Sequence, residues 1–212
     1  MSDENEWLRL TREDPGHSSW YIERMRAKTA AGEDLAGEAR LIDAMVSRGS
    51  RILDAGCGPG RVGAFLTDAG HEVVGVDIDP ALIAAAEEDH PGPRWLVDDL
   101  STLDLPSRGI DEGFDAIVCA GNVLTFLAPE THVAVLASLR AHLRGGGRLV
   151  VGFGTDRGYE VDDFLEDVGS AGLVVDVLLS TWDLQPYAQG DGFLVAILRP
   201  EREAGTTDGD PT

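Results

Sequence analysis

One stretch, residues 51 to 79, constrains the fold of this chain more than any other. It starts with R-I-L-D-A, passes through G-C-G-P-G, and ends with H-E-V-V-G-V-D-I-D. The two ends read as buried strands. Between them, apolar residues recur at the spacing of one helix face: Val62, Phe65, Leu66 and Ala69. Because a helix here connects two strands, the stretch predicts a βαβ unit in a parallel sheet.

The glycine turn in this unit lies where a doubly wound sheet binds a nucleoside, and an acid follows at the tip of the next strand. A dinucleotide site needs G-x-G-x-x-G/A, but Arg61 stands at the third small position. Asp54, just before the turn, would repel a pyrophosphate. It suits a ligand that carries an ammonium group and a sulfonium charge. S-adenosylmethionine has both charges and a ribose diol.

At L-D-A-G-C-G-P-G the chain resembles the first motif of class I S-adenosylmethionine-dependent methyltransferases, and the resemblance extends over about residues 35 to 198. It implies S-adenosyl-L-methionine as the cofactor and S-adenosyl-L-homocysteine as the product. It also implies an α/β fold, with a Rossmann-like, doubly wound sheet of seven strands whose last strand is antiparallel. Helices before the sheet would form an N-terminal cap over the cofactor.

The resemblance also implies which residues bind the cofactor. The glycines let the backbone approach the methionine part, and Asp54 supports its amino group directly or through water. Asp77 takes the ribose hydroxyls. In the D-D-L segment Asp99 fits best as acceptor from the adenine amino group, Asp98 beside it remains possible, and both could instead belong to a surface turn. The full predicted set is Asp54, Gly56, Cys57, Gly58, Gly60, Asp77, Ile78, Asp98, Asp99, Leu100, Ala120, Gly121 and Asn122.

Four segments divide the chain. The charged start is expected to be flexible, apart from what Trp7 and Leu8 hold in place. Two helices at 18 to 30 and 34 to 48 are expected to form the cap. The tail is rich in Glu, Thr, Gly and Asp and is expected to be disordered. The predicted boundaries are 1–14 for the flexible start, 15–49 for the helical cap, 50–199 for the methyltransferase domain and 200–212 for the acidic tail.

Composition excludes several classes of function. The net charge of -21 argues against nucleic acid, which is bound by clustered Lys and Arg. The two cysteines, Cys57 and Cys119, give no disulfide framework, and Cys57 is interpreted as a turn residue rather than a nucleophile. The five histidines lack metal-ligand spacing, so no metal is expected. No basic apolar leader and no run of 18 apolar residues occurs, which predicts a cytoplasmic protein without a membrane partner.

Three side chains are candidates for catalysis, each with a structural alternative. His17 precedes the first cap helix and could reach an acceptor. Tyr21 could cover the sulfonium with its aromatic face, or only dock the cap. Asn122 follows a central strand and could lie near the reacting methyl group, or only form a turn. Other side chains are expected to rim an acceptor pocket: Arg157, Tyr159, Trp182, Gln185 and Tyr187. His71 and His90 are expected on the opposite face, with His132 and His142 on an outer helix.

These observations favour methyl transfer by in-line displacement to a small-molecule acceptor. The acceptor's identity and the oligomeric state do not follow from the residues. A protein that binds the cofactor or its product without turnover remains an alternative, as does an aminopropyl transferase on the same fold.

Overall fold

The computed structural model describes residues 4–201 and contains one sheet of seven strands, in the order β3-β2-β1-β4-β5-β7-β6. Neighbouring strands from β3 to β5 are parallel, whereas β7 is antiparallel to both β5 and β6. The predicted fold class is confirmed. The strands are β1 Arg51–Ala55, β2 Glu72–Asp77, β3 Arg94–Val97, β4 Phe114–Cys119, β5 Leu143–Gly154, β6 Leu173–Leu179 and β7 Phe193–Pro200.

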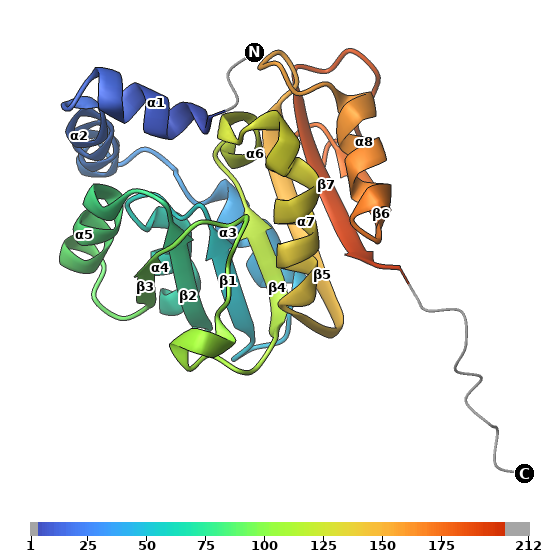
Figure 1. Cartoon of the computed structure of the whole chain (residues 1–212). Helices are drawn as coiled ribbons and strands as arrows, with labels where there is room; N and C mark the ends of the chain where they lie inside the picture. The colour runs from blue at the N-terminus through green and yellow to red at the C-terminus, as the bar shows by residue number, and fades with distance from the viewer. Residues whose placement is uncertain (1–3, 202–212) are drawn as a thin grey trace, which may run out of the picture.

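Helices cover both faces of the sheet, with α7 and α8 in front and α3 and α4 behind in Figure 1. Helices α1 and α2 lie beside α5 at the end of the sheet where α6 also lies. The helices are α1 Glu6–Glu13, α2 His17–Ala30, α3 Gly37–Met45, α4 Arg61–Asp68, α5 Pro80–Asp89, α6 Val123–Phe126, α7 His132–Ala141 and α8 Val161–Ser170, with short 3-10 turns at Pro106–Arg108 and Pro129–Thr131.

Successive residues of the central strands are buried on opposite faces, as expected for a sheet covered on both sides. Leu53 and Ile117 belong to the core under α7 and α8, while Ile52 and Val118 belong to the core under α3 and α4. Between β3 and β4, an irregular segment that contains the 3-10 turn at Pro106–Arg108 packs on the sheet. Its apolar side chains are buried: Leu103, Leu105 and Ile110.

The start of the chain differs from the expectation of a flexible segment, because Glu6–Glu13 forms helix α1. The Asn5 side chain caps this helix, accepting from the backbone N–H of Trp7 at 3.0 Å and of Leu8 at 3.2 Å. Arg9 pairs with Glu6 and Glu13 one turn away on either side. The charged residues that suggested disorder therefore form ion pairs along the helix.

Element ends differ elsewhere. The second cap helix is shorter than predicted and spans Gly37–Met45. The glycines at 145 to 147 lie within β5, where the register against β4 shifts between Phe114 and Ala116. The short helix α6 was not predicted. The expected tail at 200–212 falls outside the described residues beyond position 201.

Trp95 packs where three glycines leave room for its ring. The indole is buried, and its N–H donates to the carbonyl of His90 at 3.0 Å. A Cβ on Gly75 would stand 2.2 Å from the ring, and a Cβ on Gly60 or Gly63 would also clash with it. The glycines thus admit a large side chain next to the turn that follows β1.

We expect Gly75→Ala to lower the free energy of unfolding by about 1 to 3 kcal/mol, because the methyl group must displace a buried indole. Denaturant titration measures the change. Gly145→Ala is the matched control, since a Cβ there meets open space, and it should leave stability nearly unchanged. Equal stability of the two variants would contradict the packing described here.

Candidate functional site

The turn after β1, residues 56–60, is called the glycine turn below, and its shape requires glycine. Gly56, Gly58 and Gly60 have φ of 77°, 55° and 88°, in the left-handed region that other residues rarely adopt. A Cβ on Gly56 would also lie 2.2 Å from Val123 of α6. The N–H groups of residues 56 and 57 donate to the carbonyl of Val76, at 2.8 and 3.0 Å. The turn is therefore tied to the end of β2.

Asp77 ends β2 and fastens the glycine turn from the other side. Its carboxylate accepts from the N–H of Gly58 at 2.8 Å and from the N–H of Asp79 at 3.0 Å. Burial raises the pKa of Asp77 to about 6, although these hydrogen bonds favour the ionised form. Asp77 also lines the main cavity. A buried carboxylate that reaches a cavity can accept hydrogen bonds from a ligand's hydroxyl groups.

Asp54 lies in β1 directly before the turn and is buried. Its carboxylate accepts from the N–H of Gly63 at 2.9 Å. Burial raises the pKa of Asp54 to about 7, against the opposing effects of that hydrogen bond and of Arg61. The Arg61 side chain turns away to the carbonyl of Leu35 and to Glu38, whose Oε2 lies 2.8 Å from Nη1. This outward position explains how Arg fits at a place where a dinucleotide motif has a small residue.

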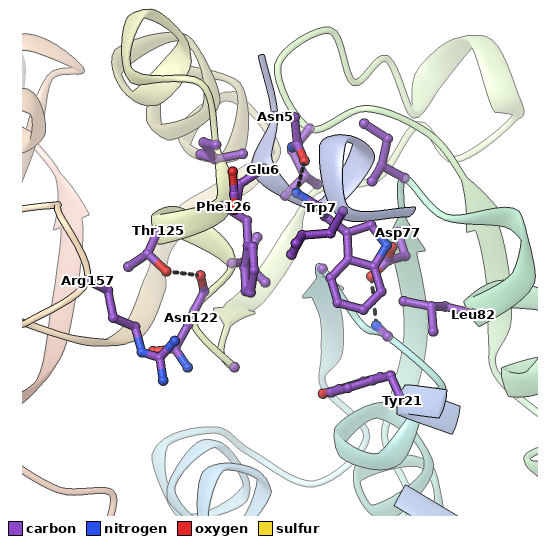
Figure 2. Close-up of a pocket in the computed structure, with 18 of the residues that line it drawn as sticks. Asn5, Glu6, Trp7, Tyr21, Asp77, Leu82, Asn122, Thr125, Phe126 and Arg157 are labelled. Atoms are coloured by element: carbon purple, nitrogen blue, oxygen red, sulfur yellow. Dashed lines mark hydrogen bonds between the residues drawn. The ribbon is translucent and has the colours of Figure 1, made fainter. Parts of the chain in front are cut away.

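A cavity of about 930 Å³ lies between the glycine turn, α1, α2 and α6. Figure 2 shows Trp7 and Tyr21 beside Asp77 on one side of it, with Arg157 and Asn122 on the other. Its lining includes eight residues of the predicted set, namely Gly56, Gly58, Asp77, Ile78, Asp99, Leu100, Gly121 and Asn122. A small pocket of about 50 Å³ next to the turn is lined by three more, Asp54, Cys57 and Ala120.

Two residues of the predicted set line neither space. Gly60 faces the Trp95 ring, so it contributes to the packing of the turn and not to a cavity wall. Asp98 pairs with Arg108 at 2.8 Å, whereas its neighbour Asp99 lines the cavity and accepts from the N–H and hydroxyl of Ser101. The structure thus separates the two adjacent acids, with Asp99 on the side of the cavity.

The three catalytic candidates all line the cavity. The His17 ring packs edge-on against Trp7, with centroids 5.0 Å apart. Tyr21 lies over the glycine turn, where a Cβ on Gly58 would be 3.8 Å from its ring. Asn122 has φ of 67° and its Oδ1 accepts from the N–H of Gly154 at 2.8 Å. Asn122 therefore joins the ends of β4 and β5, as its turn-forming alternative suggested, and still reaches the cavity.

Two lining residues were missed by sequence reasoning. Trp7 was expected to hold part of the charged start in place but not to line a cavity, and its indole N–H donates to Asp79 at 2.9 Å. His132 was expected on an outer helix, but it is buried at the start of α7 and stacks on Tyr159 with ring centroids 3.9 Å apart. Its Nε2 lies 2.9 Å from the carbonyl of Leu124 in α6. Both positions arise from contacts between distant segments, which no local pattern signals.

Of the five residues expected to rim an acceptor pocket, two line the cavity. Arg157 and Tyr159 line the cavity. Trp182 packs instead against Gly152 and the core under α3 and α4, and Tyr187 packs on the core under α7 and α8. Gln185 is exposed. The connection between β6 and β7 therefore does not line the cavity, because its aromatic side chains cover the sheet.

Within residues 4–201, His, Cys, Asp and Glu side chains do not gather into a group that could hold a metal ion. None of the helices there has the length and apolar character needed to cross a membrane. Burial raises the pKa of the Cys57 thiol well above its ordinary value, which keeps it protonated and unreactive.

Known proteins resemble this chain over its central part and in its fold. A model of the methyltransferase domain family matches residues 52–147. A trans-aconitate 2-methyltransferase from Azoarcus sp. is 31% identical over 133 residues, which cover 62% of this chain and 47% of the relative. An uncharacterized methyltransferase from Mycobacterium tuberculosis is 36% identical over 114 residues, covering 52% of this chain and 54% of the relative. The chain thus spans about half the length of these curated relatives.

A solved structure agrees over a greater length. The TehB-like S-adenosylmethionine-dependent methyltransferase from Corynebacterium glutamicum is 48% identical, with a TM-score of 0.83, and the match covers 89% of this chain and 100% of that one. With the glycine turn, the acid after β2 and the antiparallel β7, this likeness defines the family. The chain belongs to the class I S-adenosylmethionine-dependent methyltransferases.

Because its folded-state pKa of about 7 lies above the ordinary value of 3.8, Asp54 holds a proton in the folded protein that the unfolded chain has already lost at intermediate pH. This stabilises the fold at acid pH, and the stabilisation is lost as pH rises from 4 to 7. In Asp54→Asn the amide oxygen still accepts from Gly63. Between pH 4 and pH 7 we therefore expect the unfolding free energy of the variant to fall less than that of wild type. The difference between the two proteins should reach up to about 4 kcal/mol.

Denaturant titrations of wild type and variant at several pH values measure this difference. Asp68→Asn, at an exposed position, controls for the loss of one carboxyl group. Parallel pH profiles for wild type and Asp54→Asn would contradict a raised pKa at Asp54.

Proposed function

We propose that this chain transfers the methyl group of S-adenosylmethionine to a small-molecule acceptor, and that both bind in the cavity under α1 and α2. The observation that carries the proposal is the buried Asp77 carboxylate, which lines the cavity and holds the glycine turn through the Gly58 amide. The glycine turn supports the proposal as well, since Gly56 and Gly58 line the cavity without side chains and leave their backbone open to a ligand.

Each part of the cofactor has a complementary group in the site. Asp77 accepts from the ribose hydroxyls, and Asp99 accepts from the adenine amino group, with Ile78 against the ring. The glycine turn holds the methionine part through its backbone. Asp54, at the adjoining small pocket, offsets the charge of the amino group. A bound cation favours the ionised carboxylate, which burial alone disfavours.

The cofactor supplies an activated methyl group on a sulfonium, so the protein's task is to align the acceptor and exclude water. Aromatic side chains from three segments meet at the cavity for this purpose. Trp7 of α1 packs edge-on against Tyr21 of α2 at 5.5 Å and against Phe126 of α6 at 5.8 Å. Tyr21 offers its ring face to the positive charge.

The size of the cavity and the helices that border it support a small acceptor. A volume of about 930 Å³ is near the upper end for small-molecule sites, which leaves room for the cofactor and a second compound. Helices α1 and α2 wall the cavity on one side, where a macromolecular substrate would need open access. Among the relatives, the trans-aconitate 2-methyltransferase carries a small acceptor in its name.

We expect Asp77→Ala to weaken the binding of S-adenosylmethionine at least about tenfold, because hydrogen bonds to a charged group contribute about 1.5 to 3 kcal/mol each. Calorimetric titration measures the affinity, and circular dichroism checks that the variant is folded. Asp68→Ala is the control, since that acid is exposed at the end of α4. A folded Asp77→Ala protein with wild-type affinity would refute the proposed ribose contact.

Turnover is tested separately by incubating the wild-type protein with methyl-labelled S-adenosylmethionine and a panel of small acceptors. The proposal requires labelled product together with S-adenosylhomocysteine. Tight cofactor binding without product from any acceptor would favour a protein that only binds this ligand.

A further inference from the structure

Arg157 has an unusual environment for an arginine in an acidic protein. It follows β5 in the loop before α8 and lines the cavity. Acidic residues outnumber Lys and Arg by 38 to 17, so partners are plentiful. Within residues 4–201, however, Arg157 is the one arginine with no carboxylate, backbone carbonyl or aromatic ring as partner. Even Arg24, which also lines the cavity, lies over the Trp20 ring at 5.4 Å.

The Arg157 side chain lies beside the amide of Asn122. A Cβ on Gly154 would be 3.1 Å from the Nε of Arg157, and the N–H of Gly154 donates to Asn122 Oδ1 at 2.8 Å. Both side chains thus pack against the same residue. Figure 2 shows Arg157 and Asn122 beside each other. Because the amide oxygen of Asn122 is engaged, its NH₂ group is the part left to bind a ligand.

Polar groups near this side of the cavity are already engaged. The Tyr159 hydroxyl donates to Asp167 at 2.7 Å, and Thr125 Oγ1 donates to the carbonyl of Asn122 at 2.9 Å. The Nε2 of His132 is held by a carbonyl of α6. Asp156, next to Arg157 in the chain, is exposed and forms no ion pair with it in the described structure. A guanidinium and an amide NH₂ therefore remain as free donors.

The carboxylates around the cavity do not neutralise this charge either. Glu4 and Glu6 pair with arginines of α1, and Asp77 accepts from two backbone amides. Asp99 is engaged by Ser101. The cavity therefore has an acidic side at Asp77 and a side at Arg157 where positive charge is uncompensated.

We propose that the methyl acceptor is a carboxylic acid and that Arg157 binds its carboxylate, with the Asn122 amide donating to the same group. The planar guanidinium matches the two oxygens of a carboxylate through paired hydrogen bonds. A phosphate ester carries up to two negative charges, for which the single free cation at this side is not enough. The inference rests on the proposed function, because it names the acceptor class of the same cavity.

The test measures thermal unfolding of the protein saturated with S-adenosylhomocysteine in the presence of matched compounds. The probes are succinate, citrate and benzoate, their neutral amides, and glycerol phosphate as a phosphate ester. We expect at least one acid, but not its amide, to raise the unfolding midpoint. Arg157→Gln should weaken the apparent affinity for that acid about tenfold or more, because a charge-assisted hydrogen bond is lost.

Two further variants sharpen the result. Arg157→Lys keeps the charge but not the planar fork, so it should bind the acid with intermediate affinity. Arg199→Gln removes an arginine with a half-exposed side chain that pairs with Asp176 at the far edge of the sheet, and it should behave as wild type. Titration with S-adenosylhomocysteine should give the same affinity for all of these proteins.

The carboxylate assignment is overturned if no acid shifts the midpoint, if Arg157→Gln responds to acids as wild type does, or if amides or the phosphate ester bind equally well. These outcomes leave the proposed function standing, provided that S-adenosylhomocysteine binds. Failure of the wild-type protein to bind S-adenosylhomocysteine would overturn both proposals.

Discussion

The hydrogen bond from the Gly58 amide to the Asp77 carboxylate joins the ends of the first two strands, and the arrangement of the site depends on it. The same carboxylate accepts from Asp79, the residue that begins α5. Asp79 in turn accepts from the Trp7 indole and from the hydroxyl of Ser18. One continuous chain of hydrogen bonds therefore runs from the glycine turn to α1 and α2. Because these helices wall the cavity, the cap and the sheet are positioned by a common set of acids.

Charge is distributed unevenly around the cavity. On one side, burial raises the pKa values of Asp54 and Asp77, so each carboxylate gains when a cation or a hydrogen-bond donor approaches. On the other side, Arg157 has no partner in the described structure. A positively charged cofactor and a negatively charged acceptor would each meet the opposite sign. Such a distribution of charge would orient the proposed cofactor and acceptor relative to each other.

Much of the fold followed from the sequence because its signals are local. The apolar run of β4 and the helical spacing after the glycine turn can be recognised from neighbouring residues alone. The position of Asp77 follows from the same βαβ unit. Prediction failed where tertiary contacts decide the structure. Trp7 is ordered by Asp79 from a distant part of the chain, and His132 is drawn into the cavity wall by Tyr159. Trp182 packs on Gly152 of β5 and does not line the cavity. Its position in the sequence does not reveal this contact.

Backbone hydrogen exchange with and without S-adenosylhomocysteine tests the central claim most directly, namely that the cofactor binds beneath the cap. The account predicts that amides of the glycine turn gain protection together with those of Glu6–Glu13 and His17–Ala30, since all three border the cavity and are linked through Asp77 and Asp79. Protection gained at the turn alone, with both helices unchanged, would contradict the account and indicate a cofactor cleft that stays open.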